Sequence, residues 1–205
     1  MGSSPRAGST PPELQENTVT TLVAPPSTPI VALDPYDNTT AKMLPAGTAR
    51  YLWALTRLCL GWTFLWPFLD KTFGLHHQTA TGSAWIHGGS PTKGFLSGAT
   101  GPLEGFYQSF AGQAWADWGF MLGLICIAVA LLLGIGMRIA AVSGSVLLLL
   151  MWSASFPPQD DLFMDNHIIY ALVLLGLAVV GAGNTLGLGR WWTHTSLVRR
   201  HPWLT

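Results

Sequence analysis

The stretch FMDNHIIYAL, residues 163–172, places an acid, an amide and a histidine directly before a long apolar run. Asp165 and Asn166 suit the N-cap of a helix, where an acid also favours the positive end of the helix dipole. His167 and Tyr170 are three residues apart and therefore share one helix face. A histidine at a membrane boundary can pass protons near neutral pH. The stretch therefore predicts either a plain helix cap or a site at which protons move.

A second group of candidates lies in RYLWALTRLCLGWTFLWPFLDK, residues 50–71. At 100° per residue, Arg57, Gly61, Phe64, Phe68 and Lys71 fall close to one line along a helix. A charge inside an apolar span costs at least about 2.5 kcal/mol, which makes Arg57 a functional candidate. The alternative is a structural arginine that pairs with another helix. Arg57 and Lys71 are about 21 Å apart along the axis, and the aromatic gap between them suits a flat apolar ring.

The neighbour of Lys71, Asp70, points to the other side of this helix and is a candidate proton donor. The end of the apolar run 50–69 and the start of the run 167–187 are both expected on the outer side of the membrane. Their polar residues would then converge, together with Tyr170, at one mouth. The catalytic candidates are Arg57, Asp70, Lys71, Asp165 and His167. The candidates for holding a flat ring are Phe64, Phe68, Trp85 and Tyr170.

The amino-acid composition indicates which kind of fold positions these residues. The chain is 49% hydrophobic and 10% charged, against about 25% charged residues in soluble domains. Ten tryptophans fit aromatic belts at a membrane surface, and a net charge of zero gives no sign of nucleic acid binding. Four runs reach the length that a bilayer requires. They cover about 50–69, 117–136, 139–156 and 167–187, and predict an all-α, antiparallel four-helix membrane bundle in a lipid bilayer.

Positive residues predict the orientation of the spans, because they favour the cytoplasmic side. Arg50, Arg138 and Arg190 flank the spans at one end, whereas Asp160 and Asp161 lie at the other. Both termini are therefore expected in the cytoplasm. Residues 1–47 are predicted to be a disordered tail, 48–195 the membrane domain, and 196–205 a second cytoplasmic tail.

The outer segment 70–116 is too long for a turn. It contains SPTKGFLSG, in which Ser90 and Pro91 suit a helix start, and PLEGFYQSF, with aromatic residues at helical spacing. We expect two short interfacial helices, which either pad the membrane surface or cover a pocket. Cys59 and Cys126 lie in apolar runs and are expected to be buried, inert thiols.

Metal binding is not expected. His76, His77 and His87 form a weak pattern that no cysteine pair or HExxH motif supports.

Several stretches in this order resemble the DoxX/DoxD family. They are RLCLGWTFLWPFLDK, GGSPTKGFL, LLLGIGMRIAAVSGSVLLLLMW and DNHIIYALVLLGLAVVGAGNTLGLGRWW. Arg57, Gly61, Phe64 and Lys71 match the opening motif of the family, whereas Phe68 stands where many members have glycine. The resemblance covers about residues 48–195 and implies a four-helix protein of a prokaryotic plasma membrane.

The DoxD branch is the large subunit of thiosulfate:quinone oxidoreductase, which oxidises two thiosulfates to tetrathionate and reduces a quinone. The resemblance therefore implies a menaquinone or ubiquinone type of acceptor, a small sulfur anion as donor and a small second subunit. Neither a metal nor a flavin is expected in this chain. Fold likeness does not fix function, and some DoxX relatives act as anchors in redox complexes. A non-catalytic subunit of a respiratory or redox-defence complex is therefore the alternative. A small-solute transporter is a third reading, although no inverted repeat is visible.

Overall fold

The computed structural model describes residues 1–2, 46–158 and 163–204, and all the helices in these ranges belong to the unit Met43–Thr205. Most of the predicted tail, and both Asp160 and Asp161, lie outside the described residues. The four longer helices are α1 (Ala46–Phe73), α4 (Ala114–Leu133), α5 (Met137–Ala154) and α6 (Asn166–Val179). The described part of the chain contains no strand, so the all-α prediction is confirmed for it.

The connections hold shorter elements. Between α1 and α4 lie η1 (Thr81–Ser83), η2 (Trp85–His87), α2 (Lys93–Ser97), η3 (Gly101–Leu103) and α3 (Glu104–Gln108). After α6 come η4 (Ala182–Asn184), α7 (Gly189–Thr193), α8 (Ser196–Arg200) and η5 (Pro202–Leu204). Short helices therefore occur in both stretches of the long segment where the sequence predicts them. Ser90 lies before α2 and its Oγ accepts a hydrogen bond from the Lys93 N–H at 3.2 Å.

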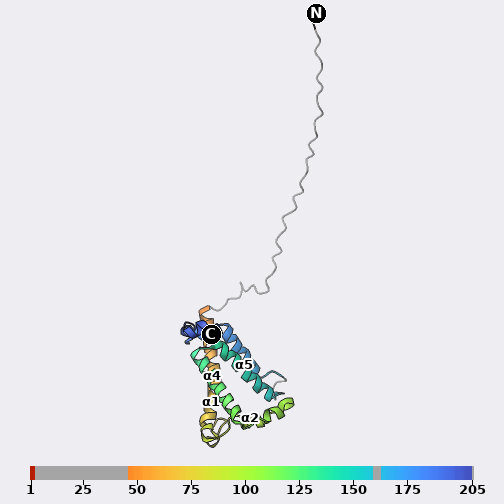
Figure 1. Ribbon diagram of the computed structural model, residues 1–205, viewed down its shortest axis with the longest axis vertical. Helices are drawn as coiled ribbons and strands as arrows, with labels where there is room; N and C mark the ends of the chain where they lie inside the picture. Colours follow the sequence, from red (N-terminus) through yellow and green to blue (C-terminus); the bar gives the residue numbers. More distant parts are fainter. Residues whose placement is uncertain (3–45, 159–162, 205) are drawn as a thin grey trace. The chain divides into compact units, whose positions relative to one another are not determined.

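The longer helices pack in sequence: α1 against α4, α4 against α5, and α5 most extensively against α6 (Figure 1). Gly144 lets α5 approach α6, since a Cβ at this position would stand 2.7 Å from Leu174. The adjacent Ser145 donates a hydrogen bond to the carbonyl of Ala171 at 3.2 Å. Gly144 and Ser145 therefore lie at a close contact between α5 and α6, as small residues often do between membrane helices.

Three helices among the described residues are long and apolar enough to cross a membrane: Gly47–Phe73, Ala114–Leu133 and Met137–Ala154. Their outward faces expose large apolar side chains such as Trp62, Leu122 and Leu149. A soluble monomer rarely exposes so much contiguous apolar surface. The chain is therefore a membrane protein, with lipid as the natural environment of these faces.

The fourth predicted span differs from the structure. The sequence predicts a span over 167–187, but α6 ends at Val179, which gives it 14 residues and a length of about 21 Å. Gly181 adopts a left-handed conformation with φ 63°, and the chain turns there into η4. Gly183 then packs against the carbonyl oxygen of Gly134, where a Cβ would stand at 2.5 Å. The small residues of this run therefore fold the chain back instead of extending the helix.

The packed helices have two ends. We call the end at which α1 and α5 begin and α4 and α6 end the proximal end, and the opposite end the distal end. The core between them is apolar, with Met121, Leu131, Leu174 and Leu177 fully buried. The prediction of buried cysteines is wrong, because Cys59 and Cys126 are both free and exposed on the helix surfaces. Apolar surroundings suit a thiol that faces lipid as well as one in a core.

Candidate functional site

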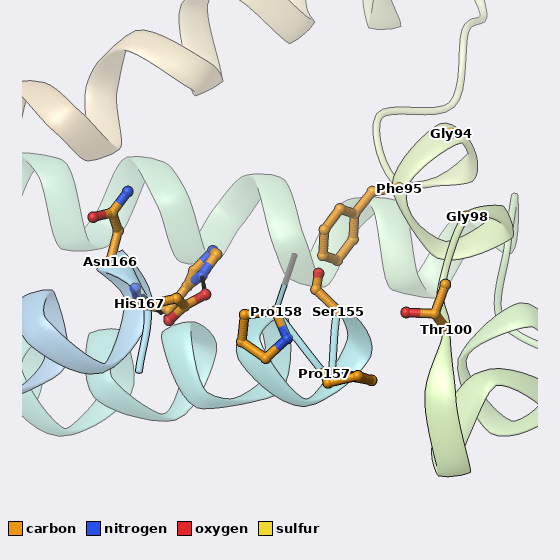
Figure 2. Close-up of a pocket in the computed structure, with 10 residues that line it drawn as sticks. Gly94, Phe95, Gly98, Thr100, Ser155, Pro157, Pro158, Asn166 and His167 are labelled. Atoms are coloured by element: carbon orange, nitrogen blue, oxygen red, sulfur yellow. Dashed lines mark hydrogen bonds and ion pairs between the residues drawn. The ribbon is translucent and has the colours of Figure 1, made fainter. Parts of the chain in front are cut away.

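A pocket of about 500 Å³ lies at the distal end, where the end of α5 and the start of α6 meet α2. Figure 2 shows the Phe95 ring of α2 beside Ser155, with His167 and Asn166 at the start of α6 and Pro158 between these groups. Its lining residues are Gly94, Phe95, Gly98, Thr100, Ser155, Pro157, Pro158, Asp165, Asn166 and His167. The size lies within the range of small-molecule sites, about 300–1,000 Å³.

Asp165 and His167 form the polar centre of this distal pocket. The Oδ2 atom of Asp165 lies 2.6 Å from Nδ1 of His167, and both side chains are partly exposed. The Oδ1 atom accepts hydrogen bonds from the N–H groups of His167 at 2.9 Å and Ile168 at 3.3 Å. Asp165 is therefore the N-cap of α6, as predicted, and it also fixes the orientation of the imidazole.

Two opposing effects act on the pKa of the Asp165 carboxyl. Burial raises this pKa, whereas the hydrogen bonds from His167 and Ile168 and the charge of the His167 ring lower it. The lowering effects together are larger, so the pKa lies below its ordinary value and Asp165 is ionised at neutral pH. An ionised carboxylate can only accept hydrogen bonds, so Nδ1 of His167 carries the proton that it donates to Asp165.

Asp70 and Lys71 do not line the distal pocket. The carboxylate of Asp70 is buried and accepts hydrogen bonds from the N–H groups of His77 and Gln78, both at 3.1 Å. These bonds tie the loop after α1 back onto the helix. Of the residues predicted to share one mouth, the structure brings Asp165 and His167 together in the pocket. Asp70 instead binds backbone N–H groups of the loop that follows α1.

Arg57 lies near the proximal end and is fully buried. Its Nη1 donates to the carbonyls of Leu131 and Leu132 in the last turn of α4, the second at 3.1 Å. Its Nη2 donates to the carbonyl of Leu186 at 2.8 Å and to that of Thr185 at 3.4 Å. The last carbonyls of a helix lack intrahelical partners, so Arg57 caps α4 and links it to the chain after α6.

The predicted aromatic residues share one environment. Phe64 belongs to the main core cluster, and Phe68, Trp85 and Tyr170 are partly buried and pack against the same cluster. Trp85 also contacts Trp118 edge to face, with ring centroids 4.7 Å apart. These side chains therefore connect the start of the outer segment to the distal half of the core.

One structural anchor is absent from the predictions. Asp117, in the first turn of α4, is buried, and its Oδ1 accepts from Ser90 Oγ at 2.9 Å and from Thr92 Oγ1 at 2.6 Å. The Thr92 N–H adds a third bond at 2.9 Å. An acid at the edge of an apolar run was the available signal, and its partners lie 25 and 27 residues away. This anchor places α2, and hence Phe95, beside the pocket.

The histidines of the outer segment have local partners. His76 Nε2 lies 2.7 Å from Thr81 Oγ1, and His87 Nδ1 lies 2.8 Å from the carbonyl oxygen of Thr81. Within the described ranges, no three His, Cys, Asp or Glu residues are grouped so as to hold a metal ion.

Comparisons with known proteins add no relative. No family model matches the chain, and no curated protein or solved structure resembles it closely enough to count as a match. The resemblance to the DoxX/DoxD family therefore stays a prediction from the sequence.

Proposed function

We propose that the chain is a quinone-linked membrane oxidoreductase of the thiosulfate:quinone type, and that the distal pocket receives the quinone ring. One observation carries the proposal: the Asp165–His167 pair opens into a pocket of about 500 Å³ at the end of the apolar helices. In this proposal the quinone reaches the pocket from the lipid phase, and the aqueous surface at the distal end supplies the protons.

The chemistry of the pocket lining fits a quinone ring. Phe95, Pro157 and Pro158 offer apolar contacts to its faces, and Ser155 and His167 offer hydrogen bonds to its oxygens. Sites for such molecules combine apolar walls with a few polar groups. Either a menaquinone or a ubiquinone type fits this description, because both share the ring with two carbonyl oxygens.

The proposed overall reaction balances as two thiosulfates plus quinone plus two protons, giving tetrathionate and quinol. The acceptor takes two electrons and two protons in this reaction. In this proposal His167 delivers protons from its ring nitrogen, and Asp165 holds the imidazole in position. Asp165 also disfavours a dianion in the same pocket, so the sulfur anion binds elsewhere. Lys71 at the same end of the bundle and a small second subunit are the proposed sources of that site.

The proposed orientation has both termini in the cytoplasm of a prokaryotic cell. The four described acids, Asp70, Glu104, Asp117 and Asp165, all lie at the distal end or in the segment that leads to it. Arginines dominate the proximal end, which supports placing that end inside.

The test is quinol formation by the complete complex in membranes, with a histidine pair as variants. His167→Gln keeps hydrogen-bonding capacity but cannot titrate, and general acid–base catalysis contributes about 100-fold or more, so turnover is expected to fall by about that factor. His77→Gln removes an exposed histidine outside the pocket lining and serves as the matched control. Unchanged turnover in His167→Gln, with normal protein levels, would contradict the proposal.

A non-catalytic membrane subunit is the second candidate, favoured by one specific observation. Arg57 and Asp70, two of the predicted catalytic residues, both bind backbone groups. In this case the N-terminal region contacts a larger redox complex. Deletion of residues 2–45, which stops before α1, is expected to abolish co-purification of that complex. Retention of the complex after the deletion would argue against this role.

A further inference from the structure

A second pocket, of about 300 Å³, lies at the proximal end, away from the distal pocket. The start of α1, the η4 region and α7 contribute its lining, which consists of Arg50, Tyr51, Asn184, Thr185, Leu186, Gly187 and Arg190. Two arginines from segments 140 positions apart in the chain therefore open into one small volume. An arginine pair on a shared pocket is well suited to an anionic oxygen group such as phosphate.

No acid among the described residues forms an ion pair with the arginines of this proximal pocket. None of its lining residues is acidic, and the one side-chain ion pair within the described ranges is that of Asp165 with His167, at the distal end. Among the described residues, the interaction of the Arg50 side chain is with the ring of Tyr51, whose centroid lies 5.1 Å from the guanidinium carbon. Both guanidinium groups are thus available to an anion that enters the pocket.

Buried Arg57 shapes the same pocket from beneath. It donates to the carbonyls of Thr185 and Leu186, which both line the pocket, so a third positive charge lies under its wall. Leu186 adopts φ 50°, a left-handed conformation that is costly for a residue with a branched side chain. Local strain of this kind persists where the surroundings enforce it and marks candidate functional sites. The hydrogen bond from Arg57 to the Leu186 carbonyl, at 2.8 Å, is one of the contacts that hold this segment.

The surroundings of the pocket identify the source of the anion. Leu186, Leu188 and Trp191 next to the pocket are exposed apolar residues, and Arg199 follows on α8. Tryptophan and arginine together are typical of the headgroup level of a membrane. We propose that the proximal pocket binds the phosphate of an anionic phospholipid, with Arg50 and Arg190 as its ligands. This site is independent of the proposed quinone chemistry.

The test uses the full chain in a neutral detergent, titrated with short-chain phosphatidylglycerol or phosphatidylcholine, and native mass spectrometry counts bound lipid. We expect one preferred phosphatidylglycerol per chain, and excess inorganic phosphate should not displace it. Arg50→Gln and Arg190→Gln should each weaken binding by about tenfold, because a hydrogen bond to a charged group is lost. Arg199→Gln removes the same charge outside the pocket lining and should stay within about twofold, because a charge that does not contact the phosphate acts on it through solvent, where salt screens it.

Three results would overturn the inference. Equal weakening in all three variants would indicate diffuse surface charge, and no weakening in either pocket variant would remove the site. Displacement of the lipid by inorganic phosphate at similar concentrations would assign the pocket to a free anion. Because Arg50 and Arg190 are exposed, their variants should unfold at the same temperature as the wild type, and this is checked first.

Discussion

Replacing Arg57 by methionine separates a structural role from a catalytic one. Methionine has a similar length and no donors, so the substitution removes every hydrogen bond to Leu131, Leu132, Thr185 and Leu186 and keeps apolar bulk. The carbonyls of Leu131 and Leu132 end α4 and have no helical partners of their own. The wild-type arginine therefore joins two parts of the chain that are otherwise linked by packing and by the backbone hydrogen bond from the Leu188 N–H to the Leu133 carbonyl, at 2.7 Å.

The size of the effect follows from the number of carbonyls that lose a donor. Four carbonyls accept hydrogen bonds from the guanidinium group, and the bond to Thr185 is the longest, at 3.4 Å. A hydrogen bond to a charged group contributes about 1.5–3 kcal/mol to stability. Removing the buried charge also removes its desolvation cost, which offsets part of this loss. The free energy of unfolding should therefore fall by about 3 kcal/mol. Arg138→Gln is the matched control, because Arg138 is exposed and donates one long bond, at 3.4 Å to Pro202.

The assay is thermal unfolding in detergent, combined with turnover per folded molecule. We expect Arg57→Met to lower the midpoint clearly and Arg138→Gln to leave it nearly unchanged. Turnover per folded molecule should stay close to the wild-type value, because Arg57 lies at the opposite end from the distal pocket. An Arg57→Met protein with normal stability and no turnover would refute this reasoning and return Arg57 to the catalytic set.

Further predictions concern the helix contacts and caps. Gly144→Ala should destabilise by about 1–3 kcal/mol, because a Cβ there meets α6 at 2.7 Å, whereas Gly176→Ala has open space and should not destabilise; equal midpoints in thermal unfolding would contradict this. Asp165→Ala should cost about 1 kcal/mol through the lost cap. Folding lowers the pKa of Asp165, so the carboxylate stabilises the fold at pH values above the ordinary carboxyl pKa. This stabilisation is lost as the pH falls through the lowered pKa of the folded state. Denaturation curves in which Asp165→Ala loses the same amount of stability in acid would refute the role of Asp165. Asp117→Ala should release Thr92 and increase protease cleavage between residues 88 and 100, and an unchanged cleavage pattern would show that the anchor is dispensable.

Local patterns in the sequence were sufficient for part of the fold. The second and third predicted spans match α4 and α5 within three residues at each end, since uniform apolar runs bounded by glycine leave few alternatives. The end of α6 was not predictable in this way, because it depends on Gly183 packing against Gly134 in another turn of the chain. The apolar run in the sequence continues past Val179, whereas the helix ends there.

The candidate site likewise has local contacts that the sequence predicts and long-range contacts that it does not. The cap formed by Asp165 and His167 is a contact between residues two apart, and the sequence predicted it. The fate of Arg57 depends on carbonyls 74 and 129 residues away, which no local pattern reveals. The position of Asp70 along its helix predicts a place at the shared mouth. Its carboxylate instead binds the backbone of the loop that follows the helix, a contact that the position alone does not reveal.

The central claim is that a quinone ring occupies the distal pocket, and photolabelling tests it most directly. The complete protein in native membranes is irradiated with a photoreactive quinone analogue, with and without excess unlabelled quinone, and labelled residues are located by mass spectrometry. We expect labelling of residues 94–100, 155–158 and 165–167, the segments that line the pocket, and its suppression by the unlabelled quinone. Labelling that spreads evenly over the exposed faces of α1, α4 and α5, and that unlabelled quinone does not reduce, would contradict the account.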